Sequence, residues 1–175
     1  MPKIYAGSLE SPWQTNNLSN ITNIDFSDYN AILFCSLSTT IDQLQQTEKS
    51  FSRFNDVLIV TIEDVNDYED YNMQTFDDAP SADNVYPIYQ FLHEHRNENI
   101  FVACSAGISR TGAIVDYLIY YKYVVTTQSN QSTHMMPNPT IQRLLSEIDT
   151  NYQPHYLSFY NHSQIMPVDL PEIKF

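Results

Sequence analysis

The chain has 175 residues, 42% of them hydrophobic, which predicts a single globular domain with a substantial core over residues 1–175. Its formal net charge of −13, from 8 Lys plus Arg against 21 Asp plus Glu, disfavours binding to nucleic acid or to an anionic membrane surface. The two cysteines, Cys35 and Cys104, are too few for a disulfide framework and match no zinc spacing. With neither a signal peptide nor a transmembrane run visible, we expect a cytoplasmic protein.

Apolar runs with the length of β-strands alternate along the chain with patterns typical of helices. The strand-length runs are PKIYAGS at 2–8, AILFCS at 31–36, VLIVTI at 57–62 and IFVA at 100–103. Helices are predicted at 41–54, after Thr39 or Thr40 as the cap, at 85–97, at about 110–125, and from Pro139 after the cap Asn138. The polar segments 63–84 and 126–137 are expected to be loops. The alternation predicts an α/β fold, with a central, mostly parallel sheet of four to five strands flanked by helices.

The loop after the strand at 100–103 carries the residues that suggest a chemical function. A cysteine and an arginine, Cys104 and Arg110, are separated there by five residues and followed by a helix. The predicted phosphate-binding backbone groups between them belong to Ser105, Ala106, Gly107, Ile108 and Ser109. Arg110 can hold two phosphate oxygens through its planar guanidinium group. Two of the only three glycines, Gly107 and Gly112, lie in or just after this loop, where tight turns and close ligand approach need them.

The helix that follows the loop and the guanidinium group of Arg110 also act on Cys104. A helix amino terminus and a neighbouring guanidinium group both favour a thiolate over a thiol, so Cys104 is predicted to be a nucleophile. The hydroxyl of Thr111 could donate to the sulfur and help it to leave a covalent intermediate. The alternative is that Cys104 is simply a buried core residue after a strand, which is how we interpret Cys35.

The string CSAGISRTG at 104–112 resembles the phosphate-binding signature of the protein tyrosine phosphatase superfamily, and in particular of its compact dual-specificity phosphatases. Further likenesses to family elements are found in IYAGSL, AILFCSL, VLIVTIEDV and MPNPTIQRLL. The resemblance implies a cysteine-dependent phosphatase, a phosphoric monoester hydrolase with a cysteinyl-phosphate intermediate. Cys104 would attack phosphorus and Arg110 would bind the equatorial oxygens, with no metal and no cofactor implied.

The resemblance also implies an aspartate that protonates the leaving oxygen and then activates water. Asp64 is the predicted acid because it follows the third apolar strand, where the family places this residue. Asp67 and Asp70 are the alternatives. The chain departs from the family at Ala103, where a histidine usually orients the loop and tunes the thiolate.

We expect a protein phosphatase that acts on phosphotyrosine, with phosphoserine and phosphothreonine as further substrates of a shallow pocket. The chain lacks room for the segment that deepens the pocket of tyrosine-specific domains. Two alternatives stay open. Ala103 motivates the first, a catalytically weak, phosphate-binding pseudophosphatase that docks phosphorylated partners. The second is a phosphatase of RNA 5′-triphosphate or of phosphoinositides, which the lack of lysine in the loop disfavours.

The segment 63–84 bears on the choice of substrate. It contains eight acidic residues and no Lys or Arg, so it should repel polyanions and attract phosphosites flanked by basic residues. The expected partner is therefore a phosphorylated protein or peptide. The composition does not predict an oligomeric state.

Overall fold

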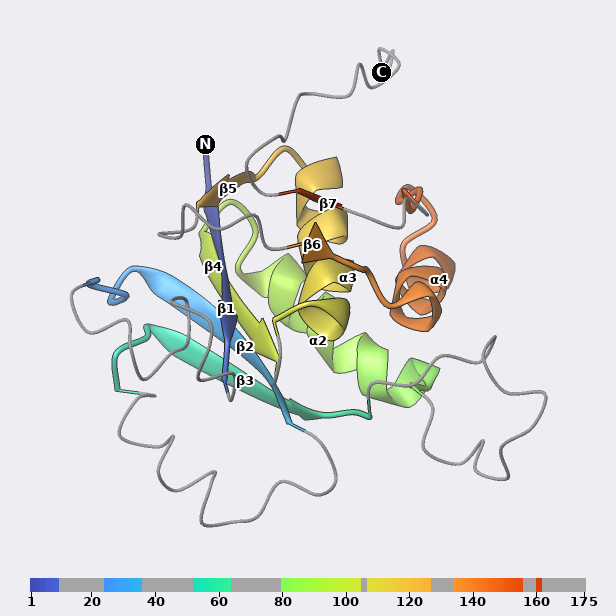
Figure 1. Cartoon of the computed structure of the whole chain (residues 1–175), viewed down its shortest axis with the longest axis horizontal. Coiled ribbons are helices and arrows are strands. Elements are labelled where there is room, and N and C mark those ends of the chain that lie inside the picture. The colour runs from blue at the N-terminus through green and yellow to red at the C-terminus, as the bar shows by residue number, and fades with distance from the viewer. Residues whose placement is uncertain are drawn as a thin grey trace.

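A five-stranded, all-parallel sheet organises the part of the chain that the structure describes (Figure 1). The structure is a computed structural model, and it describes residues 1–9, 24–35, 52–63, 80–104, 107–126, 134–155 and 160–161. In spatial order the strands are β3 (Asp56–Thr61), β2 (Tyr29–Cys35), β4 (Asn99–Cys104), β1 (Lys3–Ser8) and β5 (Val124–Thr126). The predicted α/β fold with a parallel sheet is therefore confirmed.

Among the described residues, α2 (Ala82–Glu94) and α3 (Ser109–Tyr120) pack on one face of this sheet (Figure 1). A further helix, α4 (Pro139–Ile148), packs against both of them. The central strands β1, β2 and β4 each contribute a fully buried isoleucine to the contact: Ile4, Ile32 and Ile100. No helix among the described residues combines the length and the apolar character that crossing a bilayer requires.

Aromatic side chains cover the other face of the sheet. The ring of Phe26 lies 5.1 Å from that of Phe101 and 5.2 Å from that of Tyr5, between ring centroids. Phe54 packs 4.9 Å from Phe101, and the guanidinium carbon of Arg53 lies 5.1 Å from the centre of the Phe26 ring. Burial on both faces explains why β2 and β4 are almost continuously apolar rather than alternating.

Most of the predicted elements are present. The four predicted strands correspond to β1, β2, β3 and β4, and the helix expected at 85–97 is α2, which begins and ends three residues earlier. The predicted cap Asn138 accepts hydrogen bonds from the backbone N–H groups of Thr140 and Ile141, and α4 follows it as expected. The helix predicted at 41–54 falls outside the described residues up to position 51, and residues 52–54 form a turn and a bend instead of a helix end.

The predicted position of the carboxyl end of α3 is wrong. The helix ends at Tyr120 instead of continuing to about 125, because Lys122 adopts a left-handed conformation with φ of 65°. The N–H groups of Lys122 and Tyr123 then bond to the carbonyl groups of Ile119 and Leu118, which closes the helix as a Schellman motif does, but without a glycine. The β-branched residues that follow form β5, paired with β1.

The prediction of a loop over 126–137 was also wrong in part. Thr126 closes β5, and β6 (His134–Met135) pairs antiparallel with β7 (Tyr160–Asn161). Local sequence patterns could not predict this short two-stranded sheet, because its two strands are separated by more than twenty positions. Residues 127–133 lie outside the described part of the chain.

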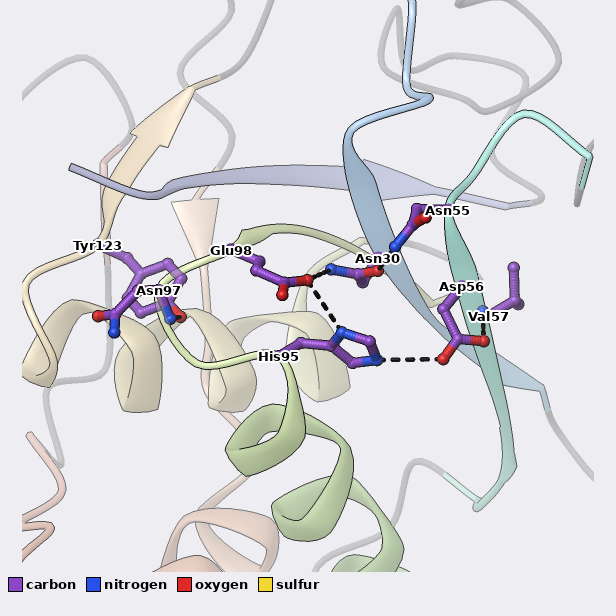
Figure 2. Close-up of polar contacts among 8 residues, drawn as sticks. All are labelled: Asn30, Asn55, Asp56, Val57, His95, Asn97, Glu98 and Tyr123. Atoms are coloured by element: carbon purple, nitrogen blue, oxygen red, sulfur yellow. Dashed lines mark hydrogen bonds and ion pairs between the residues drawn. The ribbon is translucent and has the colours of Figure 1, made fainter.

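A polar network ties together the amino ends of three strands (Figure 2). His95, which caps the carboxyl end of α2, lies 3.1 Å from Asp56 through Nε2 and 3.0 Å from Glu98 through Nδ1. Asn30 donates to Glu98 over 2.7 Å and accepts from Asn55 over 2.8 Å. The hydrogen bonds from His95 and Asn30 lower the pKa of Glu98. The network lies at the amino ends of the strands, whereas the predicted site lies at the opposite edge of the sheet, where the strands have their carboxyl ends.

Candidate active site

Cys104 is the last residue of β4, the middle strand of the sheet. It is only 1% exposed and lies opposite Ser8, the last residue of β1, in the parallel register. Its side chain belongs to the apolar cluster under the helices, on the same face as Phe34 and Val102. The carboxyl edge of a parallel sheet is where ligands bind in open α/β folds, so the predicted nucleophile stands at the expected edge.

A tight turn follows Cys104. Its carbonyl oxygen accepts from the N–H groups of Gly107, over 3.2 Å, and Leu9, over 3.0 Å, which fixes the end of β4 from both sides. Gly107 has φ of 71°, a left-handed conformation that a Cβ atom would penalise. Ser105 and Ala106, two of the predicted phosphate-binding residues, lie outside the described residues.

The amino end of α3 has no side-chain cap in the described part of the chain. The helix begins at Ser109 after Ile108, and no side chain caps its first backbone N–H groups. Such uncapped N–H groups, together with the positive end of the helix dipole, favour anions. Ile108 and Ser109, both predicted to bind phosphate, are half-buried here, so this end of the helix is not sealed by the core.

Arg110 reaches across the carboxyl edge of the sheet. Its side chain is 4% exposed, and Nη1 donates to the backbone carbonyl oxygen of Ile62 over 2.7 Å. Ile62 directly follows β3, and its own N–H group bonds to the carbonyl group of Cys35 at the end of β2. Within the described part of the chain, the Nε atom of Arg110 is buried and has no hydrogen-bond partner.

Thr111 is fully buried on the first turn of α3. Its Oγ1 atom has no hydrogen-bond partner among the described residues, so the predicted bond to the Cys104 sulfur is not formed in this structure and stays a prediction for the thiolate. Buried polar groups are nearly always paired, because leaving one unpaired costs about 1–3 kcal/mol. The unpaired buried donors of Arg110 and Thr111, at one helix end, fit a site that binds an oxyanion beside a thiolate.

Asn138 joins the amino ends of α3 and α4. Its backbone N–H group donates to the carbonyl oxygen of Ser109 over 3.0 Å, while its side chain caps α4. The sequence predicted the cap but missed the contact with Ser109. Neither this contact nor the one between Arg110 and Ile62 has a signal in the sequence, because both use backbone atoms that every residue carries.

Ala103 replaces the histidine that usually precedes the cysteine in the family that the sequence resembles. It is fully buried and faces the aromatic cluster with Leu33 and Phe101, on the other side of the sheet from Cys104. The three candidate acids, Asp64, Asp67 and Asp70, lie outside the described residues. The described segment after β3 ends at position 63, one residue after Ile62, whose carbonyl group accepts from Arg110.

No metal site accompanies this arrangement in the described ranges, where no group of three or more His, Cys, Asp or Glu side chains could hold an ion. A family model described as "DSP-PTPase phosphatase fused to NAD+ Kinase" matches residues 73–153. The match contains α2, β4, α3 and α4, and with them Cys104 and Arg110. Neither a curated protein nor a solved structure matches the chain.

Proposed function

Since this chain is a dual-specificity-phosphatase-like member of the protein tyrosine phosphatase superfamily, we propose that it is an active phosphatase of phosphoproteins. We propose phosphotyrosine as its substrate, with phosphoserine and phosphothreonine as further ones. The observation that carries the proposal is the unused donor capacity of Arg110 and Thr111 at the uncapped amino end of α3. A tetrahedral phosphate group would accept from Arg110, and the Thr111 hydroxyl group would donate to the thiolate of Cys104 beside it.

The first chemical step forms a bond between sulfur and phosphorus. The Cys104 thiolate attacks the phosphorus atom, and the bond from phosphorus to the tyrosyl oxygen breaks. Arg110 and the N–H groups of the predicted loop from Ser105 to Ser109, except that of Gly107, which bonds to the Cys104 carbonyl oxygen, would bind the three equatorial oxygens, where negative charge accumulates. The leaving oxygen takes a proton from the general acid, for which we propose Asp64.

The second step reverses these roles. A water molecule attacks the phosphorus atom of the cysteinyl-phosphate, the ionised acid accepts its proton, and the sulfur leaves as a thiolate. The hydrogen bond between Arg110 and Ile62 supports Asp64 in this part, because it places the chain two residues before Asp64 against the guanidinium group. A reduced Cys104 is needed throughout, which fits a cytoplasmic protein.

The proposed partner is a phosphorylated peptide segment with Lys or Arg near the phosphosite. The net charge of −13 and the eight acidic residues of segment 63–84 support this choice, and they disfavour nucleic acid and anionic membranes as partners. Phosphopeptides with basic flanks should therefore show a lower KM than acidic ones, and the difference should shrink as salt rises. Equal KM values for the two kinds of peptide at low salt would show that segment 63–84 does not select substrates by their charge.

The experiment that tests the proposal measures turnover of para-nitrophenyl phosphate by the wild type and by Cys104→Ser. We expect turnover by the wild type and none by the variant, together with a phosphoenzyme that rapid denaturation traps in the wild type and not in the variant. Cys35→Ser is the matched control, because Cys35 is the other cysteine of the chain, is buried as well and takes no part in the steps above.

Two results would favour the alternatives. Retained binding of phosphopeptide with no turnover would identify a pseudophosphatase, which the replacement of the usual histidine by Ala103 still motivates. A higher kcat/KM on RNA 5′-triphosphate or on a phosphoinositide than on phosphotyrosine peptide would change the substrate class. The described surroundings of the site contribute one cation, Arg110, which favours a single phosphate group over a polyphosphate.

A further inference from the structure

A second buried polar cluster lies on α3, two helical turns beyond Ser109. Its centre is the carboxylate group of Asp116, which is fully buried. Gln142 donates to it from Nε2 over 3.0 Å, Tyr152 donates from its hydroxyl group, and the backbone N–H group of His155 donates over 3.2 Å. The Nδ1 atom of His155 lies 3.3 Å from the other carboxylate oxygen. The proposed phosphatase steps do not use any of these groups.

Burying a carboxylate raises the free energy of the folded state unless hydrogen-bond donors surround it. The donors are therefore expected to stay on Asp116 in the folded protein. All of them come from α4 or from the segment that follows it. Gln142 and Tyr152 are themselves buried, which means that their polar atoms could not turn to water if Asp116 were lost. The cluster therefore binds α4 and its continuation to the middle of α3.

Two contacts, separated along both helices, fix the first turn of α4 on α3, which lies beside it (Figure 1). At one, the N–H group of Asn138 bonds to the carbonyl oxygen of Ser109. At the other, Gln142 bonds to Asp116. Ser109 and Asp116 are two turns apart on α3, while Asn138 and Gln142 are one turn apart on α4, and the backbone of Gln142 bonds to that of Asn138.

We infer that Asp116 is a positioning residue for the anion site: by holding Gln142, it keeps Asn138 on the carbonyl group of Ser109 and so fixes the turn that leads to Arg110. This inference rests on the proposed function, because it concerns the same anion site. Small displacements of groups that orient a reacting substrate lower rates strongly, so loss of the clamp should weaken oxyanion binding although Asp116 does not touch the anion.

The test uses tungstate as the tetrahedral oxyanion, with the full chain and its variants. Asp116→Asn keeps the shape but removes the charge and one acceptor, and Gln142→Met cuts only the link to α4. Tyr117→Phe is the matched control, because it removes a 2.7 Å hydrogen bond between α3 and Asp149, at the other end of α4. Dissociation constants are measured by calorimetry, and hydrogen exchange of the Asn138 amide reports on the clamp directly.

We expect Asp116→Asn and Gln142→Met to weaken tungstate binding about tenfold and to speed exchange of the Asn138 amide, while Tyr117→Phe changes binding less than about twofold. If Asp116→Asn does not fold, Gln142→Met alone decides. Wild-type affinity in Gln142→Met, or an equal loss in Tyr117→Phe, would overturn the inference and leave the proposed function standing. A wild type that does not bind tungstate would overturn both.

Discussion

The guanidinium group of Arg110 donates to the backbone carbonyl oxygen of Ile62 over 2.7 Å, across 48 positions of sequence. This contact links the first turn of α3, the helix that follows β4, to the end of β3; in the sheet, β2 lies between β3 and β4. One end of the guanidinium group is thereby fixed, and the buried Nε atom keeps its donor capacity. The geometry suits a group that must hold an anion without reorienting.

Replacing Arg110 by lysine should lower kcat/KM for para-nitrophenyl phosphate by about 100- to 1,000-fold, the usual cost of losing one preorganised donor to a transition-state oxyanion. A lysine ammonium group cannot bond to Ile62 and also present a planar pair of donors to phosphate. Arg143→Lys is the control, since Arg143 lies on α4 in an exposed pair with Glu147 and should tolerate the same change. Equal kinetics in both variants would remove Arg110 from the site.

Replacing Asp64 by asparagine should lower kcat by about 100-fold or more with a poor leaving group such as phenolate, and by less with para-nitrophenolate. A general acid acts in its protonated form, so wild-type activity should fall as the pH rises through the pKa of the acid. That falling limb of the kcat/KM profile should be missing in the variant. Asp67→Asn and Asp70→Asn should keep it, and its loss in either of them would transfer the role to that residue.

Replacing Asn138 by alanine should lower the free energy of unfolding by about 1 kcal/mol, the typical cost of a lost N-cap. The side chain is buried and accepts from the N–H groups of Thr140 and Ile141 over 3.1 Å each. Asn138→Ser should recover most of the loss, because a serine hydroxyl can accept the same bonds. Urea denaturation measures both values, and a serine variant no more stable than the alanine variant would contradict the capping role.

The contact of Tyr117 and Tyr121 with Asp149 should make stability depend on pH at both ends of the scale. Burial raises the pKa of Asp149, but hydrogen bonds from Tyr121 and Tyr117 outweigh it and hold the pKa below its ordinary value. Burial, followed by the contact with Asp149, raises the pKa of both tyrosines. The stabilisation is therefore complete between about pH 4 and about pH 10, and it is lost as the pH falls through the lowered pKa or rises through the raised ones.

The double variant Tyr117→Phe/Tyr121→Phe should be less stable than the wild type by about 2 kcal/mol near neutral pH, since hydrogen bonds to a charged group carry about 1.5–3 kcal/mol each and one tyrosine is partly exposed. The difference should shrink as the pH is lowered towards about 3, because the wild type then begins to lose the same interaction. Urea titrations at several pH values measure it. A difference that stays constant from neutral to acid pH would show that Asp149 is not the acceptor that matters.

Local patterns accounted for the elements that build the site. Continuous apolar runs predicted β2 and β4, and the Asn-Pro pair at 138–139 predicted the start of α4, because a cap and a fixed φ angle act within a few residues. The spacing of Cys104, Gly107 and Arg110 predicted a strand, a tight turn and a helix, and the left-handed Gly107 shows why that position takes glycine. The pattern failed at the end of α3, where Lys122 takes a conformation that usually marks a glycine.

The sequence by itself thus determined the order of the elements and the residues of the predicted phosphate loop, since both depend on interactions between near neighbours. Only the tertiary structure decided which carbonyl group holds Arg110, which strand pairs with β5, and why an aspartate is tolerated at position 116 in the core. Those features depend on backbone atoms and on donors from distant segments, and the identity of a residue does not reveal them until packing brings the segments together.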